Sequence, residues 1–320
     1  MKFLVLTSTN PHYNLAVEEY LFLNSQEEVF MLWQNSPTVV IGKNQNASVE
    51  INRDVLDSYG VKIARRITGG GAVYHDLGNV NYSFITPKSK TSGIDFEYFT
   101  RPIIKALASM GVEVRLSGRN DLETLDGLKI SGSAQHRVED RVLHHGTLLF
   151  SSDLTFMSKV LTPDREKLKS KAVKSVKKRV CNVKDLCPIN SVNSFIASLQ
   201  SFIISEFNPS VIYQPKNAEI DALYQRNSSY EWLFPQKAML SSYQKISSKR
   251  YDFGRVEIAL DFDNDVIKRA KITGDFFGEQ DVCNLEKLME NKTVDKLQSI
   301  DVSKYILGMT TSEFIDLIKN

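Results

Sequence analysis

The sequence predicts an α+β protein with a mixed or antiparallel sheet, because strand-like segments are interspersed with amphipathic helices. Two tight turns support antiparallel pairing. Asp126-Gly127 separates the segments LETL and LKIS, a two-residue turn typical of hairpins. Asp263-Asn264-Asp265 separates residues 254–262 from residues 266–273, which together predict a second hairpin.

The first part of the chain is expected to be mostly strands, with two helices. Asn14 precedes a run of apolar residues at helical spacing, and asparagine is a favoured N-cap. The strand that ends at Ile67 leads directly into three consecutive glycines. We expect strands at residues 3–6, 29–33, 38–41, 61–67 and 81–85, and helices at 14–23 and at 96–110, which Gly111 ends.

The second part of the chain changes character after Leu154. In the hairpin before it, Leu128 and Ile130 face one way and Lys129 the other, because side chains alternate along a strand. We expect a strand at 145–150, a basic run at 165–179, helices at 190–208 and 217–228, a Ser- and Lys-rich linker at 241–249, then the second hairpin and short helices. This pattern divides the chain into a large domain at 1–245 and a small α+β accessory domain at 246–320.

The composition is that of an ordinary soluble enzyme. Of 320 residues, 42% are hydrophobic and 24% charged, and the net charge of +2 gives no support for binding nucleic acid. The three cysteines form no CxxC pair and are expected to be reduced thiols. The first residues contain too short an apolar run for a signal peptide, and no run approaches a membrane span. We therefore expect a cytoplasmic protein without membrane segments, and a monomer.

The stretch RRITGGGAVYHD, residues 65–76, places three glycines after two arginines. Glycine lets a backbone bend and approach a ligand closely, and arginine grips phosphate or carboxylate. The stretch is not a Walker A loop, and Tyr74 stands where a dinucleotide-binding pattern needs its third glycine. Two interpretations remain open from this stretch alone: a loop around an anionic ligand, and a tight turn between strands.

Further motifs follow in a fixed order. RRITGGGAVYHDLGN, SGRNDL, KISGSA and HHGTLL closely resemble the motifs of lipoate–protein ligases, and ITGDFFG resembles the accessory domain of that family. The resemblance covers essentially the whole chain. It implies a large catalytic domain related in fold to biotin protein ligases, at 1–245, and the accessory domain at 246–320.

The resemblance also implies a reaction. Lipoate and ATP, with Mg²⁺, give lipoyl-adenylate, and the lipoyl group then passes to a lysine ε-amine on a carrier domain. Such carriers belong to 2-oxoacid dehydrogenase acyltransferase subunits and to the glycine-cleavage H protein. The sequence does not indicate which carrier is preferred, nor whether lipoate or octanoate is the better acid.

Lys129 matches the invariant lysine of that family and is the predicted catalytic residue, stabilising the charge that develops between carboxylate and phosphate. Arg66 is the predicted phosphate clamp, whereas Arg65 needs no role beyond a surface charge. The resemblance implies nucleotide-binding residues Arg66, Gly71, Ala72, Val73, Tyr74, Asn120, Asp121, Lys129, Lys174, Lys177 and Arg179, lipoate-binding residues Gly69, Gly70, Gly71, His75, Lys129 and His145, and Asp121 as a metal ligand.

The histidines and the basic run allow other interpretations. A zinc site formed by His75, His144 and His145 is disfavoured because adjacent strand residues face opposite ways. The basic run is interpreted as a loop that closes over the adenylate, with a solvated loop as the simpler reading.

The nearest alternative function is a lipoyl or octanoyl transferase that works without ATP. It requires a cysteine nucleophile, and Cys181 in the basic run is the candidate, since neighbouring cations lower a thiol pKa. A non-catalytic carrier-binding protein would not need Lys129 and Arg66, and a biotin ligase would carry a different glycine loop.

Overall fold

The computed structural model describes residues 1–88, 93–161, 180–211, 215–235 and 240–319. Its strands are β1 (Lys2–Val5), β2 (Val29–Trp33), β3 (Thr38–Ile41), β4 (Lys62–Arg65), β5 (Val73–His75), β6 (Asn79–Thr86), β7 (Val114–Ser117), β8 (Asp121–Thr124), β9 (Lys129–Val138), β10 (Arg141–Leu149), β11 (Ser210–Val211), β12 (Lys245–Tyr251), β13 (Gly254–Asp263) and β14 (Val266–Gly274). Its helices are α1 (Pro11–Asn24), α2 (Ala47–Glu50), α3 (Arg53–Ser58), α4 (Phe96–Ser109), α5 (Leu154–Val160), α8 (Val192–Phe207), α9 (Ala218–Ser228), α10 (Tyr230–Leu233), α11 (Val282–Met289) and α12 (Thr311–Lys319), with 3-10 turns η1 (Val183–Asp185), η3 (Leu240–Ser242), η4 (Val294–Ser299) and η5 (Val302–Lys304).

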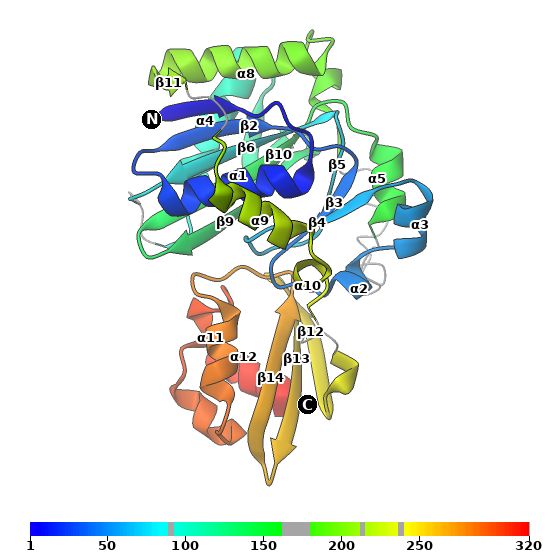
Figure 1. Cartoon of the computed structure of the whole chain (residues 1–320), viewed down its shortest axis with the longest axis vertical. Coiled ribbons are helices and arrows are strands. Elements are labelled where there is room, and N and C mark those ends of the chain that lie inside the picture. Colours follow the sequence, from blue (N-terminus) through cyan, green and yellow to red (C-terminus); the bar gives the residue numbers. More distant parts are fainter. Residues whose placement is uncertain (89–92, 162–179, 212–214, 236–239, 320) are drawn as a thin grey trace.

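The main sheet has eight strands in the order β11-β1-β2-β6-β10-β9-β8-β7 (Figure 1). β1 runs parallel to both of its neighbours, and the remaining pairs are antiparallel. Helices α4 and α8 pack on one face through residues such as Ile103 and Leu199, and α1 and α9 cover the other face through Leu15 and Ile220. The predicted α+β class with a mixed sheet is therefore confirmed.

The predicted hairpin at Asp126-Gly127 is confirmed. It joins β8 to β9, and Gly127 adopts a φ of +81°, which glycine tolerates without strain. The helix expected at 96–110 is also present as α4, and Gly111 beyond it has a φ of +82°.

A small three-stranded sheet, β4-β3-β5, determines the path of the triple glycine. β4 runs parallel to β3 and β5 runs antiparallel to it, so the connecting residues 66–72 must cross the end of β3. Gly42, the residue directly after β3, lies against this crossing. A Cβ at Gly42 would lie only 2.1 Å from the Gly70 carbonyl oxygen. The helices α2, α3 and α5 bury the other side of this sheet.

The last part of the chain has its own antiparallel sheet, β12-β13-β14, and its own core with α11 and α12 (Figure 1). The predicted linker at 241–249 is wrong in its second half, because residues from Lys245 form β12, which pairs with β13 from Lys245 to Tyr251. β12 is an edge strand, and an edge strand tolerates the serine and lysine side chains that suggested a linker.

The first helix begins earlier than the sequence predicted. Asn10 is its N-cap, with its side chain accepting from the N–H groups of His12 and Tyr13, and Pro11 occupies the first turn. Asn14, the predicted N-cap, lies inside the helix and is fully buried. Its amide nitrogen donates to Ser8 O, Gln34 O and Asn35 Oδ1 at 2.8 to 3.0 Å. Asn14 therefore ties α1 to the loops around it.

No helix in the described ranges combines the length and apolar character that a membrane crossing needs.

We predict that Asn14→Ala lowers the free energy of unfolding by about 2–3 kcal/mol, because one buried and two partly buried acceptors lose their donor. Urea unfolding monitored by circular dichroism measures this change. The matched control is Asn24→Ala on the same helix, whose hydrogen bonds to Tyr20 O and Glu219 are exposed. Equal effects of the two substitutions would contradict the assignment.

Candidate functional site

The glycine stretch wraps around the guanidinium of Arg66. Arg66 Nη2 donates to the carbonyls of Gly69 and Gly71 at 2.8 and 2.7 Å, and Nη1 donates to Val40 O at 3.1 Å. Arg66 is 5% exposed, and burial lowers its pKa to about 10, which leaves it charged at neutral pH. A buried cation thus holds the curve of the loop by saturating its carbonyls.

Arg65 is not the surface charge that the sequence suggested. It is 4% exposed, and its Nη1 donates to the carbonyls of Gly42, Lys43 and Gln45 at 2.8 to 3.0 Å. Its Nε and Nη2 donate to the carbonyls of residues 232 and 233 in α10. Arg65 therefore fastens α10 to the turn after β3. Its side chain points away from that of Arg66 because successive side chains alternate along a strand.

The accessory domain lies directly on the glycine loop. Gly70 N donates to Phe276 O at 3.1 Å, and a Cβ at Gly69 would lie 2.5 Å from that same oxygen. Gly70 has a φ of +89°, and a Cβ there would lie 2.8 Å from the ring of Phe277. The ITGDFFG motif and the triple glycine are thus complementary surfaces, which explains why residues 69 and 70 are both glycine.

Phe277 is almost fully buried between the two domains. Its ring lies 5.4 Å from the ring of Phe96 and packs with Ala134 on β9. The guanidinium of Arg119 lies 4.3 Å above the same ring and donates to Phe253 O at 2.6 Å. The ITGDFFG motif therefore contacts both the glycine loop and the turn that precedes β8.

The hairpin β8–β9 presents the predicted catalytic lysine. Lys129 Nζ lies 2.7 Å from Asp121 Oδ1, and both side chains are about one-third exposed. A Cβ at Gly132 would lie 3.1 Å from Lys129 Nζ, so the lysine side chain extends across this glycine. Asn120 beside them donates to Ser133 O at 2.6 Å, which fastens the turn to β9.

The two adjacent histidines of β10 face opposite sides of the sheet, as the sequence predicted. His144 is enclosed by rings, with Phe99 at 5.2 Å and Tyr82 at 6.0 Å. His145 Nδ1 lies 2.9 Å from Glu18 Oε1, and its Nε2 lies 2.9 Å from Thr68 Oγ1, beneath the glycine loop. Within the described ranges, no group of three His, Cys, Asp or Glu residues is arranged to hold a metal ion.

His75 is also internal and is 3% exposed. Its Nδ1 lies 3.0 Å from Asn35 Nδ2, and its ring meets the ring of Trp33 edge-on at 6.2 Å. Burial lowers the pKa of His75 to about 3, and the nearby charge of Arg66 adds to that effect. His75 therefore stays neutral under the glycine loop at physiological pH.

The remaining predicted residues differ in their placement. Gly71, Ala72 and Val73 continue from the loop into β5, whereas the ring of Tyr74 packs against Phe156 at 5.5 Å in the core of the small sheet. Burial raises the pKa of the Tyr74 hydroxyl to about 12. Lys174, Lys177 and Arg179 lie outside the described residues.

The described residues on either side of the basic run each form an isolated bridge with the large domain. Leu161 pairs with Ile51, and Val180 forms a parallel bridge with Lys129. Cys181 N donates to Lys129 O at 3.0 Å. The pKa of the Cys181 thiol is raised by burial and by Asp185, contrary to the predicted lowering by neighbouring cations.

Three residues of this site were not identified from the sequence: Glu18, Thr68 and Phe277. Glu18 lies four residues after Asn14 and four before Phe22, and all three are buried on one side of α1. A carboxylate at helical spacing between residues on the inward-facing side of a helix is unusual, and it could have marked Glu18 as a functional candidate. Thr68 and Phe277 carried no comparable signal, because their partners come from distant segments.

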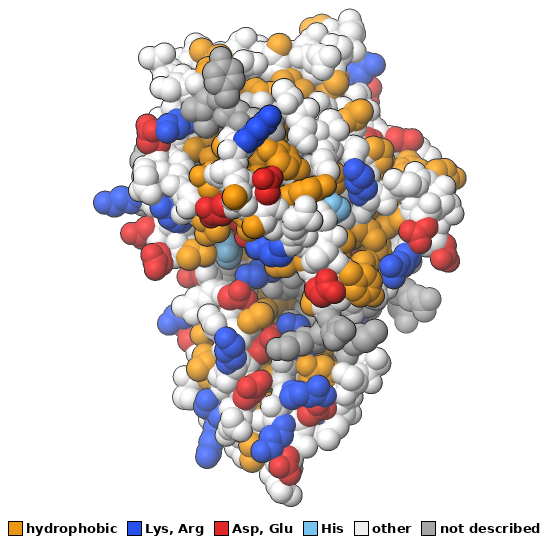
Figure 2. Space-filling view, in the orientation of Figure 1, with side chains coloured by type: hydrophobic (Ala, Val, Ile, Leu, Met, Phe, Trp, Pro, Cys, Tyr) orange, Lys and Arg blue, Asp and Glu red, His pale blue; other side chains and the backbone are white. Residues whose placement is uncertain are grey.

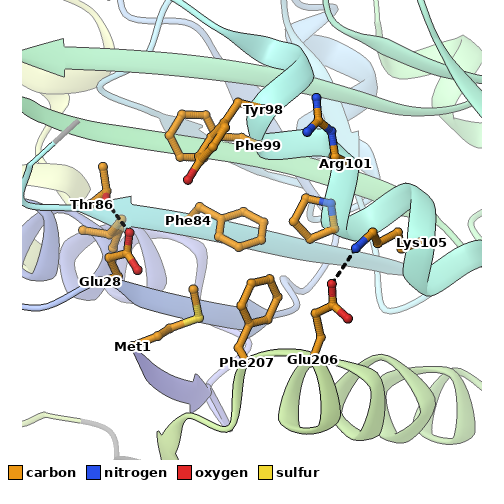
Figure 3. Close-up of a pocket in the computed structure, with 12 residues that line it drawn as sticks. Met1, Glu28, Phe84, Thr86, Tyr98, Phe99, Arg101, Lys105, Glu206 and Phe207 are labelled. Carbon is orange, nitrogen blue, oxygen red and sulfur yellow. Dashed lines mark hydrogen bonds and ion pairs between the residues drawn. The ribbon is translucent and has the colours of Figure 1, made fainter. Parts of the chain in front are cut away.

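A separate hollow of about 390 Å³ lies away from the glycine loop, where α4 approaches the end of α8 (Figure 3). Its wall includes Phe84, Phe99 and Phe207, and Lys105 pairs with Glu206 at its rim at 2.6 Å. Figure 2 shows acidic and basic side chains interspersed over the viewed face, as expected for a net charge of +2.

Comparison with known proteins assigns the chain to the ligase class of enzymes. Residues 10–206 match the family model of the lipoyl protein ligase A/B catalytic domain, and residues 241–318 match that of the bacterial lipoate protein ligase C-terminus. The chain therefore belongs to the lipoate–protein ligase family, and the resemblance stated from its motifs is confirmed.

Individual relatives agree along most or nearly all of the chain. The lipoate-protein ligase LplJ of Bacillus subtilis (strain 168) is 36% identical, over 97% of this chain and 97% of the relative. The crystal structure of LipL1 of P. falciparum in complex with lipoate is 27% identical, with a TM-score of 0.79, over 99% of this chain and 97% of that one. A bi-partite lipoate protein ligase of Thermoplasma acidophilum, described with its E2 lipoyl domain, is 28% identical with a TM-score of 0.61, over 73% and 95%.

The enclosed His144 generates a prediction about pH. Burial lowers its pKa to about 3, so between pH 6.5 and pH 3 the unfolded chain binds a proton that the folded chain does not. Stability is therefore lost as the pH falls below 6.5, by about 1.4 kcal/mol per pH unit for each such histidine. His144→Phe should make the free energy of unfolding fall less steeply between pH 6.5 and pH 5, measured by urea unfolding. An unchanged slope would show that His144 is not responsible.

Proposed function

We propose that this protein is an ATP-dependent lipoate–protein ligase. It joins lipoate to ATP to give lipoyl-adenylate and pyrophosphate, and then transfers the lipoyl group to a lysine ε-amine of a lipoyl carrier domain. The observation that carries the proposal is the partly exposed Lys129, paired with Asp121 and extended across Gly132. The lipoate complex of the P. falciparum relative and the lipoyl domain of the T. acidophilum relative support the substrate and the partner.

Lys129 is the residue to which we assign the chemistry. Adenylation brings a carboxylate against an α-phosphate, and an ammonium group beside both anions favours the charge that develops in the transition state. Asp121 orients this lysine before substrates arrive. When the anions bind, they offer Lys129 a second set of acceptors at the same place.

The glycine loop is assigned to binding both substrates, with Gly69 to Gly71 along the acyl chain and Gly71 to Tyr74 along the nucleotide. In a trans peptide the N–H and the C=O point in opposite directions. Because the Gly71 carbonyl points to Arg66, the N–H of Ala72 points away from it, as the N–H of Gly70 does toward Phe276 O. Arg66 thus acts on the nucleotide by orienting backbone donors and by its charge.

The lipoyl tail is assigned to the space beneath this loop, beside His75 and His145. Burial of about five methylenes contributes about 4 kcal/mol, at roughly 0.8 kcal/mol each. Both histidines have defined partners in Asn35 and Glu18, so they form a fixed wall.

The basic residues Lys174, Lys177 and Arg179 are assigned to the phosphates, together with Asn120. Support comes from the described residue Val180, which directly follows Arg179 in the chain and forms a bridge with Lys129.

Mg²⁺ fits the donor set at this place. Mg²⁺ is usually bound through one or two carboxylates together with substrate phosphates, and Asp121 supplies one carboxylate beside Lys129. When bound there, the ion would neutralise phosphate charge.

The division into a catalytic domain at 1–245 and an accessory domain at 246–320 is part of this proposal. The separate core of residues 256–318 supports it. The transferase alternative is not favoured, because Cys181 is partly buried and its thiol pKa is raised rather than lowered.

Mass spectrometry of apo-carriers tests the function directly. Lipoyl domains of 2-oxoacid dehydrogenase complexes and the glycine-cleavage H protein would be incubated with the enzyme, Mg²⁺ and either lipoate or octanoate. We expect acylated carrier only when ATP is added. Modification from an acyl-thioester without ATP would establish the transferase instead.

We predict that Lys129→Ala lowers the rate of pyrophosphate release by about 10²–10³-fold, because one preorganised cation is lost from the transition state. Coupled detection of pyrophosphate measures this rate. The matched control is Lys62→Ala, an exposed lysine on strand β4, which should leave it unchanged. Near-normal turnover of the Lys129 variant would refute its catalytic role.

A further inference from the structure

A chain of buried hydrogen bonds connects the core to the glycine loop. Glu18 in the middle of α1 is 1% exposed, and its carboxylate faces His145 Nδ1 at 2.9 Å. His145 Nε2 meets Thr68 Oγ1 at 2.9 Å, and Arg66 Nε donates to that same oxygen at 2.9 Å. All four residues are buried, so none of these bonds competes with bulk water.

The chemistry of the donors fixes the direction of this chain. A carboxylate only accepts, so the proton between Glu18 and His145 sits on Nδ1. The hydroxyl of Thr68 then donates to Nε2. The oxygen of Thr68 is left to accept from Arg66. Each bond determines the next, from the carboxylate to the guanidinium.

The origin of the chain is itself rigid. Ser83 Oγ donates to Glu18 Oε1, and Trp33 Nε1 donates to Ser83 Oγ at 2.9 Å. Glu18 is thereby fixed by α1, β2, β6 and β10 together. The other end of the chain holds the carbonyls of Gly69 and Gly71 through Arg66.

We propose that Glu18, His145 and Thr68 are positioning residues for the adenylation step, which fix the guanidinium of Arg66 and, through it, the curve of the glycine loop. The inference rests on the proposed function, because it assigns the loop to the acyl-adenylate. Glu18 also acts through charge, since its carboxylate favours the protonated form of Arg66 and so opposes the lowering of the Arg66 pKa by burial. A loop held from the core in this way is set before substrates bind, which positioning requires.

Thr68 is the member that tests the inference most sharply. Thr68→Val keeps the shape of the side chain but removes the hydroxyl that joins His145 to Arg66. We expect the kcat of pyrophosphate release to fall by about 10²-fold, with a smaller change in the KM for ATP, because loop geometry is lost rather than a binding contact. Thr68→Ser restores the hydroxyl and should restore kcat.

The matched control is Thr100→Val, which removes another buried threonine hydroxyl, one that donates only within α4. It should match Thr68→Val in thermal melting yet keep the wild-type kcat. A wild-type kcat for Thr68→Val, or a Thr68→Ser variant as slow as Thr68→Val, would overturn the proposal.

A second measurement needs no variant. Nitrogen-15 NMR of histidine-labelled wild-type protein should show a ring proton of His145 on Nδ1. A proton on Nε2 would reverse the chain and overturn the proposal. This reading is independent of the proposed function, which fails separately if the wild-type protein releases no pyrophosphate from ATP and lipoate.

Discussion

The site depends above all on one buried cation, the guanidinium of Arg66. A charge of this kind is stable inside a protein only if its donors are matched by acceptors, and here the acceptors are mainly backbone carbonyls. Because the carbonyls of Gly69 and Gly71 turn inward to meet it, the N–H groups that follow them turn outward. The same interaction that satisfies the arginine therefore orients the N–H groups of Gly70 and Ala72, and that of Gly70 donates to Phe276 O.

The accessory domain imposes a second constraint on the same residues. Phe276 O accepts from Gly70 N, and the ring of Phe277 lies where a side chain at Gly70 would project. Glycine is thus required twice, for the backbone conformation at residue 70 and for close contact with residues 276 and 277. One consequence is that the accessory domain covers residue 70, which is buried.

Features set by neighbouring residues were predictable from the sequence, and features set by distant partners were not. The turn at Asp126-Gly127 and the opposite orientation of His144 and His145 follow from local chemistry, and the structure has both. Asn14 looked like an N-cap because its internal position depends on the loop at residues 34 and 35. Arg65 looked like a surface charge because α10, about 170 residues later in the chain, covers it. The motifs indicated where the candidate site lies. The hydrogen-bond chain from Glu18 to Arg66 could not be predicted, because its members meet only in the folded sheet.

The two cations of the site differ in a way that separates their roles. Arg66 is almost inaccessible and bound to carbonyls that cannot leave, whereas Lys129 is about one-third exposed and paired with a single carboxylate. An ion pair at that exposure is held weakly, because solvent screens it. Lys129 can therefore exchange Asp121 for another anion at little cost, whereas Arg66 cannot exchange its carbonyl partners without changing the conformation of the loop. The lysine is therefore suited to exchanging partners, and the arginine to fixing the shape of the loop.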